Sequence, residues 1–253
     1  MKYQLLFVTF LSVLITACSS PRKVALATAS ANAAYTLVKI DSNYKADKDI
    51  AAFLQPYSKE VGRQMNVVIG TTETPLERKT PEGTLGNFVA DAMRQRAALS
   101  YKTNVDMAFV NYGGLRVDNI AAGPVVLGKM YELIPFDNIV VLLHLNGNTL
   151  HTILDLIAAK EGWPVSGVKM KIANGKAKDI LINGEPLNDD KQYTVATTDY
   201  TAKGNEGFTI LKTIPQQNNG YLFRDALIDY VKALTANNKK INAVIENRIT
   251  NAE

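Results

Sequence analysis

Two glycines and an arginine form the segment of this 253-residue chain that is best suited to ligand chemistry. Gly113 and Gly114 come directly after residues 105–110, an apolar run typical of a buried strand. Because glycine has no side chain, paired glycines let the backbone turn tightly and approach a ligand. Arg116 lies in the same segment, and a guanidinium can hold a carboxylate or phosphate oxygen through two hydrogen bonds. A surface arginine in a salt bridge is the alternative interpretation of Arg116.

The composition argues against metal chemistry and against nucleic-acid binding. One cysteine excludes an intramolecular disulfide and a cysteine zinc cage, and two histidines leave few ligands for a histidine-based centre. His144 lies in an apolar strand pattern and His151 in the helical pattern after it, so we expect structural roles for both. The 28 basic and 24 acidic residues give a weak, dispersed net charge of +4, which does not indicate a nucleic-acid-binding surface.

The single cysteine, Cys18, ends a segment typical of a secretory signal. A basic start precedes an apolar run over residues 5–16, which is shorter than the about 20 residues that span a bilayer. Residues 14–20 (LITACSS) resemble a bacterial lipobox, in which cleavage leaves the cysteine as the lipidated first residue. An incidental or buried thiol is the alternative interpretation of Cys18.

This pattern predicts three parts of the chain. Residues 1–17 are predicted to be a lipoprotein signal peptide, and residues 18–46 a lipidated cysteine with a flexible tether rich in Ser, Ala and Thr. Residues 47–253 are predicted to form the folded domain. We therefore expect a protein of the cell envelope, anchored by lipid to a bacterial membrane, and Ser19 is compatible with the outer membrane.

Hydrophobic periodicity predicts the elements that must position these residues. Helices are predicted over residues 47–63, 84–98, 149–159 and 223–234, and strands over 65–70, 105–110 and 139–145. A β-rich stretch then runs to residue 196, and Asn-Gly turn signals occur at 146–147, 174–175 and 183–184. Strands and helices do not alternate strictly. The sequence therefore predicts an α+β fold, a single domain with a mixed β-sheet and packed helices.

Five blocks of the sequence, in order, resemble the C-terminal domain of the 5′-nucleotidase family. They are TLGNFVADAMR at 84–94, DMAFVNYGGLR at 106–116, IPFDN at 134–138, VSGV at 165–168 and YTVATTDYTAKGNEG at 193–207. This resemblance implies the fold of that domain. It also implies a part in hydrolysis of phosphate esters in nucleotide catabolism, where this domain holds the nucleoside part of the substrate.

The resemblance assigns substrate-binding roles to residues of these blocks. It implies that Phe136 and Tyr200 sandwich the base, and one such stacking contact is worth roughly 1–3 kcal/mol. It implies that Asn138 hydrogen-bonds the base, since an amide both donates and accepts. The other substrate-binding residues that it implies are Arg116, Gly114 and Asn111. Core packing is the alternative for the two aromatic rings.

Three positions depart from the family pattern. Lys79 stands where the family often has a substrate-binding arginine, so the charge is kept but the planar fork is lost. The family has an acidic residue near the ribose hydroxyls, and Glu206 matches that position here. Asn205, directly before it, replaces a glycine of the family pattern. Asp137 replaces a small residue between Phe136 and Asn138, and we expect its side chain to face solvent.

The family's metal-binding segments, D-x-H, G-N-H-[DE] and G-H-x-H, do not occur in this sequence. Two-metal hydrolysis needs several Asp, His and Asn ligands, so we expect no metal and no cofactor in this chain. Because the chain carries its own signal segment, the first hypothesis is a nucleoside-binding subunit of a split 5′-nucleotidase-type hydrolase. A separate metallophosphatase subunit would hold the divalent metals. The alternative is a non-catalytic nucleotide- or nucleoside-binding envelope lipoprotein, and enzyme activity of this chain alone stays open.

Overall fold

A computed structural model describes residues 37–38 and 45–252. Its contacts divide the chain after Asp47, and residues 48–253 form one unit with its own core. The predicted signal peptide, Cys18 and nearly all of the predicted tether lie outside the described residues. Within the described part, no helix combines the length and the apolarity that crossing a membrane requires.

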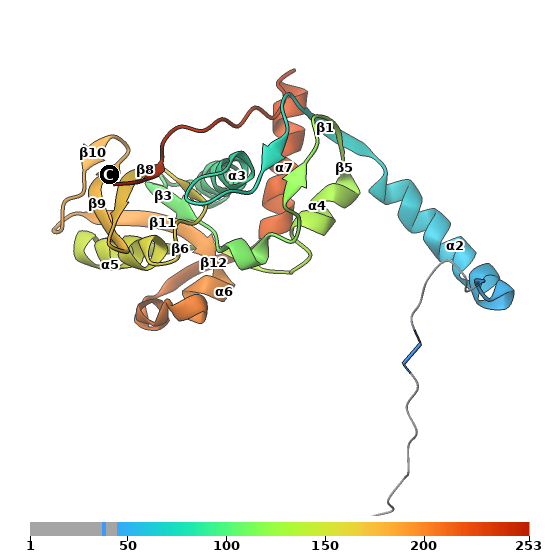
Figure 1. Cartoon of the computed structure of the whole chain (residues 1–253), viewed down its shortest axis with the longest axis horizontal. Helices are drawn as coiled ribbons and strands as arrows, with labels where there is room; N and C mark the ends of the chain where they lie inside the picture. The colour runs from blue at the N-terminus through green and yellow to red at the C-terminus, as the bar shows by residue number, and fades with distance from the viewer. Residues whose placement is uncertain (1–36, 39–44, 253) are drawn as a thin grey trace, which may run out of the picture. The chain divides into compact units, whose positions relative to one another are not determined.

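The unit is built around a mixed sheet of five strands in the order β12-β6-β11-β3-β7 (Figure 1). Central strand β11 runs antiparallel to β6 and parallel to β3. Four successive residues of β6, 140–143, are buried, which requires cover on both faces of the sheet. The strands are β3 (Met107–Phe109), β6 (Ile139–Asn146), β7 (Val165–Ser166), β11 (Gln192–Thr198) and β12 (Gln216–Leu222).

Smaller sheets complete the β structure. A four-stranded sheet has the order β10-β9-β8-β13 and contains β8 (Val168–Ala173), β9 (Lys176–Ile182), β10 (Glu185–Pro186) and β13 (Ile249–Asn251). Two antiparallel pairs join β1 (Val68–Thr72) to β5 (Gly123–Val126) and β2 (Leu76–Glu77) to β4 (Asn119–Ile120). The parallel pairing of β13 with β8 brings the C-terminal segment back onto the domain.

Helices cover the sheets, so the predicted α+β class with a mixed sheet is confirmed. In Figure 1, α3 lies on one side of the five-stranded sheet and α5 on the other. The described helices are α2 (Lys48–Met65), α3 (Thr84–Tyr101), α4 (Leu127–Leu133), α5 (Gly147–Ala158), α6 (Asp199–Ala202) and α7 (Phe223–Ala236). Short 3₁₀ turns follow β3 and α6: η1 (Tyr112–Gly114), η2 (Asn205–Gly207) and η3 (Thr209–Thr213).

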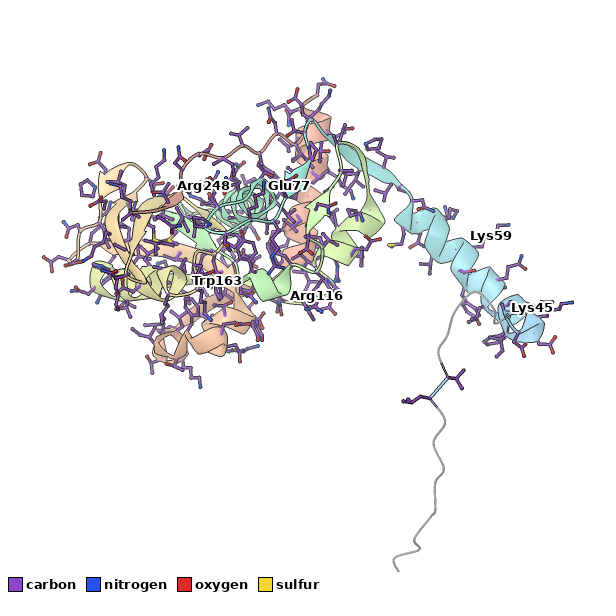
Figure 2. All side chains as sticks on the ribbon, in the orientation of Figure 1. Lys45, Lys59, Glu77, Arg116, Trp163 and Arg248 are labelled. Atoms are coloured by element: carbon purple, nitrogen blue, oxygen red, sulfur yellow. The ribbon has the colours of Figure 1, made fainter. Side chains whose placement is uncertain are left out.

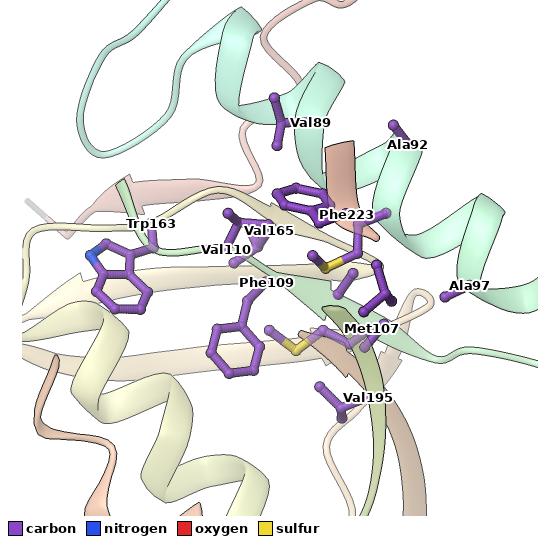
Figure 3. Packing of buried hydrophobic residues seen from close by; sticks show 14 of the residues in the cluster. Val89, Ala92, Ala97, Met107, Phe109, Val110, Trp163, Val165, Val195 and Phe223 are labelled. Atoms are coloured by element: carbon purple, nitrogen blue, oxygen red, sulfur yellow. The ribbon is translucent and has the colours of Figure 1, made fainter. Parts of the chain in front are cut away.

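Aromatic rings pack beneath the end of β3. Phe208 stacks on Phe109 with the ring centroids 5.6 Å apart and on Trp163 with the centroids 4.9 Å apart. Figure 3 shows Phe109 and Trp163 among the buried side chains on one side of the strands, with Val89 of α3 on the other side. Such a core sets the position of the backbone that leaves β3 at its carboxyl end.

The turn signal at Asn146-Gly147 marks the junction between strand β6 and helix α5. Asn146 is the residue before α5, and its Oδ1 accepts a hydrogen bond of 2.8 Å from the backbone N–H of Thr149. It is therefore a helix cap, a role that asparagine fills as readily as a turn. Position 147 has room only for glycine, because a Cβ there would lie 2.1 Å from the carbonyl oxygen of Asn188.

Helix α2 forms as predicted, two residues beyond its predicted end and with Pro56 inside it, but no residue of α2 is buried. Its apolar positions are between 50% and 68% exposed: Ile50, Phe53, Leu54, Tyr57 and Val61. Figure 2 shows side chains standing out along its length, among them the labelled Lys59. The amphipathic pattern predicted the helix correctly, but these apolar side chains stay at least half exposed in the described part of the chain.

Candidate functional site

Strand register brings three loops to one edge of the five-stranded sheet. Because β11 and β3 run parallel, the loops that follow Thr198 and Phe109 leave at the same edge. Because β6 runs antiparallel to β11, with Val140 opposite Thr198, the loop that precedes β6 reaches that edge too. The blocks around residues 111–116, 134–138 and 199–207, far apart in the sequence, therefore meet.

The turn after β3 holds Asn111 beneath two glycines. Asn111 is only 3% exposed, and its Oδ1 has no hydrogen-bond partner in the described structure. A Cβ on Gly114 would lie 3.1 Å from that oxygen, so glycine is needed for the backbone to pass over the amide. The backbone N–H of Gly114 donates to the Asn111 carbonyl at 3.1 Å and closes the turn. A buried acceptor without a partner is unfavourable unless a ligand or an ordered water supplies a donor.

The loop before β6 carries Phe136 and Asn138 at the cavity edge. Phe136 is 43% exposed, which is unusual for so large an apolar ring. The Asn138 carbonyl accepts a hydrogen bond of 2.8 Å from the backbone N–H of Phe223, the first residue of α7. This backbone bond leaves the Asn138 side chain available to the cavity that it lines.

The loop after β11 carries the second ring, Tyr200, which is 38% exposed. Asp199 ties this loop to the one opposite, because its Oδ1 accepts a hydrogen bond of 2.9 Å from the Ile139 N–H. Asn205 Nδ2 donates to the Tyr200 carbonyl at 2.7 Å. The two aromatic residues are thus mounted on loops joined to each other by the Asp199 side chain.

These loops enclose a cavity of about 370 Å³. Its volume falls in the range usual for small-molecule sites. The residues that line it are Asn111, Gly113, Gly114, Arg116, Phe136, Asn138, Tyr200 and Glu206. Seven of the eight residues predicted for substrate binding are therefore brought together, and their individual roles stay predictions.

Lys79 is the exception, because it does not line the cavity. Its ammonium is 2.9 Å from Glu77 at an exposed position. Arg78 instead lies beside the glycine turn, with its guanidinium 4.7 Å from the Tyr112 ring centroid. The Tyr112 hydroxyl donates to the Lys79 carbonyl at 2.6 Å, and burial raises the pKa of Tyr112 to about 12, so this donor stays protonated at neutral pH.

Glu206 occupies the cavity on a strained backbone. Its φ of 57° is in the left-handed region, which is uncommon for residues other than glycine, asparagine and aspartate. Its Oε2 is 3.9 Å from the ammonium of Lys160, which sits 5.4 Å from the ring centroid of Trp163. Lys160 was not predicted from the sequence, and no local pattern marks it. Arg116, labelled in Figure 2, adds an exposed positive charge to the lining.

The donor set does not fit a metal centre. Among the residues that the structure describes, no group of three or more His, Cys, Asp or Glu is arranged to hold a metal ion. His144 Nδ1 is 3.2 Å from the Thr194 hydroxyl. His151 lines a different hollow, of about 500 Å³, which has no aromatic side chain in its lining apart from that imidazole.

The fold and the cavity define a domain for binding a small ligand between loops at a sheet edge, with two exposed rings, amides and one charge of each sign. The family model "5′-nucleotidase, C-terminal domain" matches residues 68–213. The chain therefore belongs to the 5′-nucleotidase family by its C-terminal domain.

Curated relatives and a solved structure align with most of this chain. The chain is 30% identical over 209 residues to a 5′-nucleotidase of Vibrio vulnificus, covering 77% of this chain and 36% of the relative. It is 28% identical over 199 residues to Protein UshA of Escherichia coli, covering 74% and 34%. A solved 5′-nucleotidase precursor of Thermus thermophilus aligns with a TM-score of 0.70 and 26% identity, over 82% of this chain and 44% of that one. The chain thus spans about a third of the length of its curated relatives.

Proposed function

We propose that this chain binds the nucleoside part of a nucleotide and positions it for phosphate-ester hydrolysis by a separate metallophosphatase subunit. One observation carries the proposal: Phe136 and Tyr200, both partly exposed, line one cavity together with a buried amide oxygen that lacks a donor. A purine has two flat faces for stacking and polar edges for the amides of Asn111 and Asn138. Positioning alone can supply much of a rate enhancement.

The residues available for metal binding support a catalytic centre in a separate subunit. The described residues hold no cluster suited to a metal ion, whereas two-metal hydrolysis requires one. The second candidate, a nucleotide- or nucleoside-binding envelope lipoprotein without catalysis, uses the same cavity and needs no partner.

A mixing experiment separates these functions. Phosphate release from AMP is measured with the purified chain, with a metallophosphatase of the same envelope, and with both, while calorimetry measures adenosine binding to the chain. We expect adenosine to bind and the mixture to exceed the sum of the separate rates. Binding without any gain in rate would support the second candidate. Absence of binding would refute both.

The proposal places the chain on the cell envelope through an acyl anchor at Cys18, the only cysteine. Each buried CH₂ of an acyl chain contributes about 0.8 kcal/mol, so two or more chains hold a protein firmly. Growth with radiolabelled palmitate is expected to label the chain in its bacterial host, and Cys18→Ala is expected to abolish the label and release the protein from membranes. Label that persists in Cys18→Ala would show that the anchor lies elsewhere.

A further inference from the structure

Arg224, at the start of α7, hydrogen-bonds the loop that carries Phe136. Arg224 Nη2 is 2.7 Å from Asp137 Oδ1. Its Nη1 donates to the carbonyls of Ile134 and Phe136, at 3.3 and 3.5 Å. One guanidinium therefore holds the peptides on both sides of the ring. A planar fork can make these bonds at once, and the point charge of a lysine cannot.

The Arg224 side chain is itself buried and lies against an aromatic ring. It is 8% exposed, and its guanidinium carbon lies 4.4 Å from the ring centroid of Tyr131 on α4. The neighbouring residue, Phe223, is 1% exposed and bonds the loop through its backbone N–H. The loop thus packs against the buried beginning of α7.

The tip of the loop is the part that packs least on the domain. Phe136 is 43% exposed, and the Asp137 side chain is 76% exposed. The Asp137 side chain faces solvent, as expected, and its carboxylate also pairs with Arg224, 87 residues further along the chain.

We infer that Arg224 and Asp137 are positioning residues of the candidate site, which hold Phe136 in the orientation that stacks on a ligand. This inference rests on the proposed nucleoside binding. Fixing a ring before the ligand arrives removes the entropy loss that would otherwise oppose binding. The pair therefore strengthens binding without touching the ligand.

Adenosine is the suitable probe, because it is uncharged and does not respond directly to the loss of a carboxylate. We expect Asp137→Ala to raise the Kd for adenosine about tenfold, equivalent to about 1.4 kcal/mol. Asp137→Asn keeps an acceptor oxygen and should lose less. The matched control is Glu132→Ala, which removes another exposed carboxylate from an ion pair, with Lys129 on α4. An unchanged Kd in Asp137→Ala, or an equal change in Glu132→Ala, would overturn the inference.

Hydrogen exchange separates this inference from the proposed function. Without ligand, Asp137→Ala should speed amide exchange in a peptide covering residues 133–141 more than in the other peptides of the domain. If the native chain binds no adenosine, the proposed function fails, while faster exchange confined to that peptide would still show that the pair orders the loop. Exchange equal to that of the native chain would refute the pair's role outright.

A double-mutant cycle tests whether the two residues act as one unit. Arg224→Lys should raise the Kd for adenosine, and adding Asp137→Ala to it should have a smaller effect than Asp137→Ala alone. Full additivity of the two effects would show that Asp137 acts through some group other than Arg224.

Discussion

Replacing Phe136 with alanine is expected to weaken adenosine binding by about 5-fold to about 150-fold, the equivalent of the roughly 1–3 kcal/mol that one stacked ring contributes. The ring is 43% exposed, so its loss should leave the free energy of unfolding nearly unchanged. Calorimetry with adenosine gives the affinity, and urea unfolding gives the stability. Phe136→Tyr, which keeps the stacking face, should bind almost as the native chain does.

Two comparisons make this result specific to the cavity. Tyr200→Ala should weaken binding to a similar degree, because the second ring lines the same cavity. Tyr57→Ala removes an aromatic residue that is 63% exposed on α2 and does not line the cavity, and it should leave the Kd unchanged. Native affinity in Phe136→Ala would refute stacking at this position.

The largest expected loss of stability follows from Asp91→Ala. Asp91, on α3, accepts two hydrogen bonds of 2.8 Å from the guanidinium of Arg248, which is only 7% exposed. Burial alone would lower the pKa of Arg248, but the hydrogen bonds and charges of Asp91 and Glu246 raise it, so the side chain stays charged. Asp91→Ala removes both of these hydrogen bonds from a buried charge and leaves it Glu246 as carboxylate partner, so we expect a loss of about 1.5–3 kcal/mol. Urea unfolding measures this loss.

The rest of the Arg248 surroundings supplies the controls. Arg248 lies beside α3 in Figure 2, just before β13, and its guanidinium also donates to the Val165 carbonyl at 2.8 Å. Glu246→Ala removes the more exposed partner and should cost less than about 1 kcal/mol. Arg248→Met removes the buried charge and should destabilise less than Asp91→Ala. Equal losses in Asp91→Ala and Glu246→Ala would contradict the account of a buried charge.

Local pattern was sufficient for the elements with strong periodicity. Helix α3 begins at Thr84 as predicted, and α7 begins at Phe223 as predicted. Helix α4 and strand β12 were not predicted: α4 has seven residues, and β12 (QQNNGYL) is mostly polar and lacks alternation. Such elements form because neighbours pair with them, as β6 does with β12, and this information is not local.

The candidate site divides in the same way. The residues that line the cavity could be named from their blocks, since glycine turns and aromatic residues at loop edges have local signatures. The sequence could not show which of Lys79 and Arg78 lies beside the glycine turn, because this depends on which side chain faces Tyr112. Arg224 and Lys160 carry no local mark at all. Their importance comes from contacts with residues far away in the chain.

The sequence by itself determined the fold class, the family and most of the residues that line the cavity, because periodicity and short motifs are properties of neighbouring residues. Tertiary structure decided how these residues are held. Register across β3, β11 and β6 brings three loops to one sheet edge. Asp199 joins the two loops that carry the rings, and Arg224 joins the loop with Phe136 to α7. Tertiary structure also left the apolar face of α2 exposed. The physical reason is common to all: packing and long-range hydrogen bonds are decided by which surfaces meet, and a local pattern does not contain that information.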